Sequence, residues 1–125
     1  MKAWVVTVAL VCVAVATGSA PASHRAARCP LGALALPANP IGPAARVALA
    51  REDPSSRPQV VEAVLASGDL RGRGQQVRAC GSRALSRTVV VYITLRKFLP
   101  SASLSERVSF VSRFGSGWRV WQIAH

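Results

Sequence analysis

The sequence predicts an α+β fold in which a helix near the start of the domain packs on a curved antiparallel sheet. Three observations support this prediction. A run of strong helix formers follows a proline at 43, a stretch dense in β-branched residues covers 88–96, and a glycine-rich turn at 115–117 separates two strand-like segments. The helix therefore precedes the sheet, and the strands after residue 87 form a meander.

The expected helix covers 44–51. Its apolar side chains recur at three- and four-residue spacing, and Pro43 just before it suits a helix start. Asp53-Pro54 ends it, because a residue before proline disfavours helical backbone. The next segment, 58–66, remains open, since its apolar spacing fits a helical stripe while its valine content fits a strand.

Glycine alternates with charged residues over 68–74, and this composition predicts a mobile loop. The glycine spacing has some likeness to a phosphate-cradling turn. However, the flanking strand, the lysine and the serine or threonine that would hold phosphates and metal are missing. We assign no type of secondary structure to 75–86.

The pattern is clearest after residue 87. The segment 88–96 is predicted to be the central strand, and one of its faces carries Val89, Val91, Ile93 and Leu95. A serine-rich connection leads to a second strand over 108–114. A returning strand over 118–123 completes a hairpin.

We expect Gly115-Ser116-Gly117 to form a three-residue hairpin loop with glycine in the left-handed position. This loop would pair Phe114 with Trp118 and Ser112 with Val120 on one surface. On the other surface it would pair Arg113 with Arg119 and Val111 with Trp121.

Two directly opposed arginines repel each other unless they are solvated or bridged by an anion. The candidate binding residues are therefore Arg96, Arg113 and Arg119, with Trp121 as a stacking or cation–π partner. The competing interpretation is a solvated rim beside a core tryptophan.

The first 22 residues have the features of a secretory signal peptide. Lys2 supplies the positive start, 4–16 form the apolar core, and Ala20-Pro21-Ala22 supplies small residues for cleavage after Ala22. An uncleaved anchor is the alternative, but the apolar run is shorter than the roughly 20 residues of a spanning helix. We therefore expect a secreted or extracytoplasmic protein without a transmembrane span after cleavage.

Four prolines, at 30, 37, 40 and 43, prevent long helices or strands over 23–43, which we interpret as a Pro/Ala-rich arm or linker. The remaining residues, 44–125, would form one small domain. Signal cleavage removes Cys12 and leaves Cys29 and Cys80 as a candidate disulfide, which an oxidising compartment favours. Two unpaired thiols remain the alternative, because spacing alone does not show that the cysteines meet.

Basic residues outnumber acidic ones by 16 to 5, and the formal net charge is +11. Such a charge attracts polyanions, but an extracytoplasmic location disfavours nucleic acid as the partner. Anionic surface polymer or lipid fits that location better. The arginines are scattered along the chain, however, and this favours a genomic bias towards arginine over a polyanion-binding face as their explanation.

The order of helix and meander resembles the cystatin-like or NTF2-like α+β roll, in which a sheet wraps around a helix. The resemblance covers 42–125, and it rests on the strand at 87–98, the serine-rich connection at 100–105 and Gly117-Trp118-Arg119-Val120-Trp121. The chain also resembles small exported proteins of unknown role from GC-rich bacteria. The resemblance implies a family that contains isomerases and dehydratases with an acid, base or histidine in a pocket, and many members that only bind or dock.

Catalysis has little support in the residues themselves. The candidate carboxylates are Glu62, Asp69 and Glu106, and the histidines are His24 in the arm and His125 at the chain end. Nothing in their spacing predicts that two of them converge, and no motif points to a metal or another cofactor. We therefore expect an exported, non-enzymatic binding or accessory protein that engages anionic surface polymer, lipid or a partner protein. An NTF2-like roll with an interior pocket, catalytic in some form, is the alternative, and a structural role without ligand is a third hypothesis.

Overall fold

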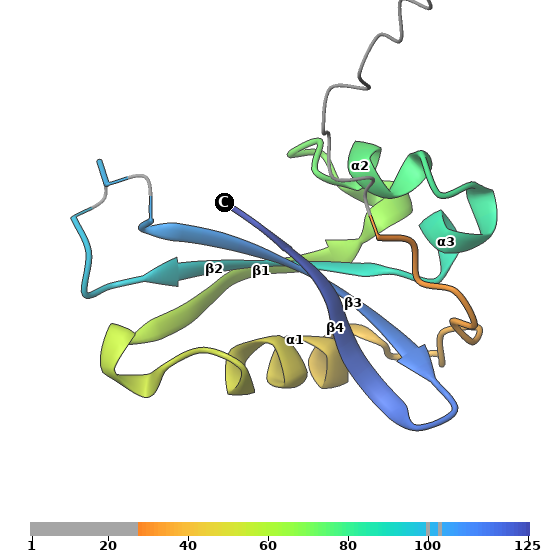
Figure 1. Ribbon diagram of the computed structural model, residues 1–125, viewed down its shortest axis with the longest axis horizontal. Helices are drawn as coiled ribbons and strands as arrows, with labels where there is room; N and C mark the ends of the chain where they lie inside the picture. Colours follow the sequence, from red (N-terminus) through yellow and green to blue (C-terminus); the bar gives the residue numbers. More distant parts are fainter. Residues whose placement is uncertain (1–27, 100, 103) are drawn as a thin grey trace, which may run out of the picture.

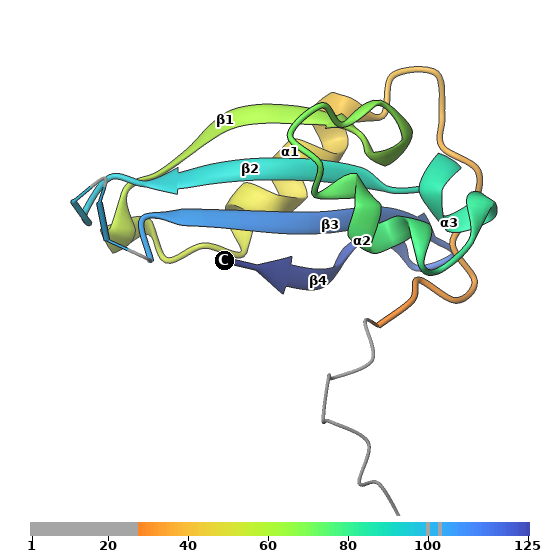
Figure 2. The same cartoon turned by 90° about the horizontal axis from the view of Figure 1, so that it is seen from above.

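The computed structural model describes residues 28–99, 101–102 and 104–125 (Figures 1 and 2). The expected signal peptide and the first residues of the arm lie outside this part of the chain. The described elements, in chain order, are α1 (Ile41–Ala50), η1 (Pro54–Ser56), β1 (Pro58–Leu65), η2 (Ala66–Gly68), α2 (Gly74–Arg78), α3 (Ser82–Ser86), β2 (Val89–Leu95), β3 (Glu106–Phe114) and β4 (Gly117–Ala124).

The strands form one antiparallel sheet of four strands in the order β1-β2-β3-β4, so the predicted α+β class is confirmed. Helix α1 covers one face of this sheet, and α2 and α3 lie together at one end of the other face (Figure 1). Within the part of the chain that the structure describes, no helix has the length and hydropathy needed to cross a membrane.

Helix α1 starts three residues before the predicted start, at Ile41, and Pro43 lies inside its first turn. Proline is tolerated there because the first N–H groups of a helix have no partner within the helix. Ala44 and Ala48 are fully buried against the sheet. Their small side chains allow the helix to approach the strands closely.

The open segment 58–66 is a strand. It pairs along its length with β2, from Pro58 opposite Leu95 to Leu65 opposite Val89, with one irregularity between Val60 and Glu62. The pairing with β2 decides between the helix and the strand, a choice that the sequence left open. The unassigned segment 75–86 contains most of α2 and all of α3, and the loop predicted at 68–74 ends where α2 begins.

The sheet has a buried core on each face. On the α1 side, the predicted face of Val89, Val91, Ile93 and Leu95 is confirmed, and it packs with the two helix alanines. On the opposite side, a second core contains residues of η2, α2, α3 and the strands, namely Ala66, Val77, Ala84, Val90, Tyr92, Val108 and Phe110. Strand β2 is therefore buried on both sides, which explains why apolar and β-branched residues occupy both of its faces.

The predicted register of the last hairpin is wrong. The turn consists of Gly115 and Ser116, and Gly117, with a φ of +113°, lies opposite Phe114. Arg113 is opposite Trp118, Ser112 is opposite Arg119 and Val111 is opposite Val120. A shift of one residue moves every side chain to the other face, so Trp118 packs against the α1-side core instead of beside Phe114.

Beyond Val111, further from the turn, the two strands pair with the offset that the sequence predicted. A bulge leaves Trp121 without a partner of its own in the ladder, and Phe110 pairs with Gln122 beyond it. The ring of Trp121 packs in the core on the face opposite α1, 5.5 Å from the ring of Phe110. The turn and the bulge together allow the two tryptophans of the hairpin, Trp118 and Trp121, to pack against apolar residues on opposite faces of the sheet.

Candidate binding site at the arginine-rich end of the sheet

The described part of the arm, 28–40, is fastened to the domain. The predicted disulfide between Cys29 and Cys80 is confirmed, with the two Cα atoms 5.5 Å apart. The backbone N–H of Leu34 donates to the carbonyl of Arg113 at 2.7 Å, and the guanidinium of Arg87 donates to the carbonyl of Ala33 at 2.6 Å. The arm therefore runs across the end of the sheet where β2 begins and β3 ends, as Figure 2 also shows.

The arm separates two hollows that open to solvent. The first, of about 420 Å³, lies between the arm and α3, and we call it the α3 hollow. The second, of about 310 Å³, lies between the arm and the β3–β4 hairpin, and we call it the hairpin hollow. Both are lined by Cys29, Pro30 and Leu31, so a single stretch of backbone forms the wall between them.

Each hollow contains a pair of arginines. Arg83 and Arg87 line the α3 hollow, and Arg28 and Arg119 line the hairpin hollow. The five carboxylate residues of the chain line neither hollow. Three of them, Glu52, Asp53 and Glu106, lie towards the other end of the sheet, and Glu62 and Asp69 belong to β1 and the loop after it. Positive charge at this end therefore has no carboxylate beside it in either hollow.

The guanidinium of Arg119 is held in a defined orientation, because it stacks on the ring of Phe114 at 4.2 Å from the ring centre. The neighbouring Trp121 is also fixed: its indole N–H donates to the hydroxyl of Ser112 at 3.0 Å, and that hydroxyl lies 3.2 Å from the hydroxyl of Thr88. A stacked guanidinium presents its N–H edge in one plane, which suits a carboxylate or phosphate group.

The structure brings together only two of the four binding residues expected from the sequence. Arg119 and Trp121 line the hairpin hollow. Arg113 is exposed on the α1 side of β3, because it pairs with Trp118 and lies two residues after Val111, on the same face of the strand. Arg96 follows the last residue of β2, at the opposite end of the sheet.

Sequence reasoning missed Arg28, Arg83 and Arg87. A helical assignment of 82–86 would have placed Arg83 and Arg87 one turn apart, on the same side. The cysteine pairing would then have brought Arg28 next to the residues after Cys80. These three arginines could have been grouped from the sequence only if 82–86 had been assigned as a helix, and that segment had no clear pattern.

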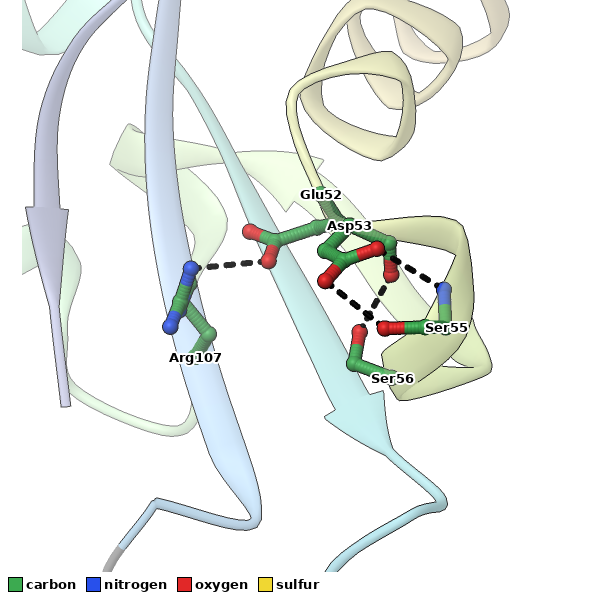
Figure 3. Close-up of polar contacts among 5 residues, drawn as sticks. All are labelled: Glu52, Asp53, Ser55, Ser56 and Arg107. Atoms are coloured by element: carbon green, nitrogen blue, oxygen red, sulfur yellow. Dashed lines mark hydrogen bonds and ion pairs between the residues drawn. The ribbon is translucent and has the colours of Figure 1, made fainter.

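The most deeply buried carboxylate is Glu52, which was not among the expected catalytic candidates. Its Oε2 accepts from Arg107 at 2.8 Å, and its side chain is 2% exposed (Figure 3). Next to it, Asp53 accepts from the N–H of Ser55 at 2.9 Å and from its hydroxyl at 2.7 Å, and these bonds lower the pKa of Asp53. Among the described residues, the buried side-chain atoms without a hydrogen-bond partner are Glu52 Oε1, Arg107 Nε, Ser109 Oγ and Gln122 Oε1.

Two of the three candidate carboxylates, Glu62 and Asp69, come together beside Arg71 and Tyr92. Glu106 lies apart from them, opposite Thr94 near the end of β2. Glu62 forms an ion pair with Arg71 at 2.6 Å. Asp69 accepts from the N–H of Gly74 at 2.8 Å and from the hydroxyl of Tyr92 at 2.7 Å, which ties α2 to the sheet. Burial, and then the bond to Asp69, raises the pKa of Tyr92 well above its usual value of 10.0. In the residues described, no three histidine, cysteine, aspartate or glutamate side chains gather as a metal site would require.

Comparisons with protein-family models, with curated proteins and with solved structures give no match to this chain. Only the geometry of the molecule bears on its role.

Proposed function

We propose that this chain is an exported, non-enzymatic binding protein that engages an anionic polymer of the cell surface through the arginine-rich end of its sheet. One observation carries the proposal: two adjacent hollows contain four arginines and none of the carboxylates of the chain. Arginine suits this task because its planar fork matches phosphate and carboxylate oxygens. The expected kinship with the NTF2-like and cystatin-like rolls is part of the proposal, and a helix packed on an antiparallel sheet supports it.

The proposal relocates the basic surface expected from the sequence. The proposed surface keeps Arg119 and Trp121 from the prediction. It adds Arg28, Arg83 and Arg87, and it excludes Arg96 and Arg113. The confirmed disulfide supports export, because disulfides persist in oxidising compartments.

Retention on an immobilised polyanion, measured against salt concentration, tests the proposal. The Arg83→Gln/Arg119→Gln variant removes one arginine from each hollow. Its affinity is expected to fall about tenfold or more, and its salt dependence is expected to weaken, because two charge-assisted contacts are lost.

A control variant with the same net charge, Arg46→Gln/Arg96→Gln, changes exposed arginines that line neither hollow. It should keep most of the affinity. Equal losses in the two variants, or retention only on anionic lipid vesicles, would contradict the proposal.

One observation favours the alternative of an interior site, namely the buried Glu52 oxygen without a partner. However, the guanidinium of Arg107 neutralises this carboxylate at 2.8 Å, and neither hollow includes it. Binding at the arginine-rich end is therefore the function that the geometry supports better.

A further inference from the structure

We infer that the ligand is a linear polyanion that crosses the arm and places one anionic group in each hollow. This inference rests on the proposed function, and it adds the shape of the ligand to the site. Its basis is the arrangement of the two hollows on either side of Cys29, Pro30 and Leu31, each with its own pair of arginines.

Each hollow is large enough to receive an anionic group together with part of the chain that carries it. The volumes, about 420 and 310 Å³, lie within the range for ligand sites, and both hollows are open to solvent. The pair of arginines in each hollow, rather than its volume, favours one phosphate or carboxylate group per hollow. A longer ligand extends out of the first hollow, and the second pair of arginines, on the other side of the arm, can then bind its next anionic group.

Between the hollows the arm forms a tight turn over 30–33, which a hydrogen bond and the disulfide hold in place. In this turn the N–H of Ala33 donates to the carbonyl of Pro30 at 3.1 Å, and Gly32 has a φ of +80°. Leu31 is 87% exposed on this turn, whereas Ala33 is buried and the disulfide fixes Cys29 just before the turn. The exposed leucine offers an apolar surface to the aliphatic part of a polymer backbone that passes over it.

Two linked anion sites bind a polymer more tightly than either site alone, because the second contact is intramolecular. This predicts a length threshold. An anion or oligomer too short to span the arm occupies the hollows separately, whereas an oligomer that spans it gains affinity abruptly. Attraction by the diffuse positive field of the whole protein would instead grow smoothly with ligand length.

The experiment titrates the full protein with inorganic phosphate and with oligophosphates of increasing length, at constant salt. A parallel series of oligoglutamates distinguishes phosphate from carboxylate as the recognised group. We expect the affinity per anionic group to rise about tenfold or more at one length. Arg83→Gln and Arg119→Gln, each alone, should abolish this step, while inorganic phosphate still binds the hollow that remains intact.

The matched control is Arg46→Gln, which removes the same charge from the exposed surface of α1 and should preserve the step. A smooth increase of affinity with length in the unmodified protein would overturn the inference, and so would a step that survives in either single variant. Both results leave the proposed function intact if binding is still salt-sensitive and weaker in the double variant. Absence of binding at every length would instead overturn the proposed function and this inference together.

Discussion

The disulfide between Cys29 and Cys80 leads to a quantitative prediction, because it closes a long loop through the arm. The two cysteines are 51 residues apart in sequence. In the chain-entropy model, a loop of this length lowers the entropy of the unfolded chain enough to stabilise the folded state by about 4 kcal/mol. For a domain of this size, removal of the bond should lower the melting temperature by about 20 °C.

The test compares a Cys29→Ser/Cys80→Ser variant with its parent by thermal unfolding monitored by circular dichroism. A Cys12→Ser background keeps the third cysteine from exchanging with the other two. The parent treated with a dithiol reductant should melt at the temperature of the double variant, because both lack the same covalent bond. A double variant that melts within about 5 °C of its oxidised parent would refute the entropic argument. It would mean that the noncovalent contacts of the arm dominate, or that the unfolded chain is already compact.

Two further predictions concern the contacts of Asp69. Gly74→Ala should destabilise the protein by about 1–3 kcal/mol in urea unfolding, because the new Cβ would lie 2.2 Å from the carbonyl oxygen of Ala66. The control, Gly68→Ala, should be nearly neutral, because its new Cβ would have no atom within 4 Å. Equal losses of stability in the two variants would contradict the prediction. Tyr92→Phe should cost about 1–2 kcal/mol at neutral pH through loss of the bond to Asp69. Because the pKa of Tyr92 is raised in the folded state, stability should fall in the unmodified protein as the pH rises above the usual value of 10.0, and it should fall less in the variant. Tyr92 is the single tyrosine, so tyrosinate absorbance follows its ionisation directly, and ionisation at the pH of free tyrosine in the folded protein would contradict the prediction.

The helix and the central strands could be predicted because their patterns are local. The alanine-rich segment before Asp53 and the β-branched run after residue 87 have intrinsic preferences that the tertiary structure does not override. The buried face of β2 followed from simple alternation. Even there, the sequence did not show that the opposite face of β2 is buried as well, because that burial depends on α2 and α3.

The candidate site was predicted only in part, because it is assembled from segments far apart in the chain. Arg119 and Trp121 come from the hairpin, Arg83 and Arg87 from the region of α3, and Arg28 from the arm. The hairpin register was predicted one residue away from the observed one near the turn, and such a shift exchanges the two faces. The pairing of arginines inferred from that register was therefore wrong.

The sequence by itself determined the α+β class, the position of the helix and the central strand, and the pair of cysteines suited to a disulfide, because each depends on residue type or short-range periodicity. Tertiary structure alone decided that 58–65 is a strand, which face each hairpin residue occupies, and which arginines share a hollow. These features depend on contacts between distant segments, whose energies exceed the small local preferences of the chain.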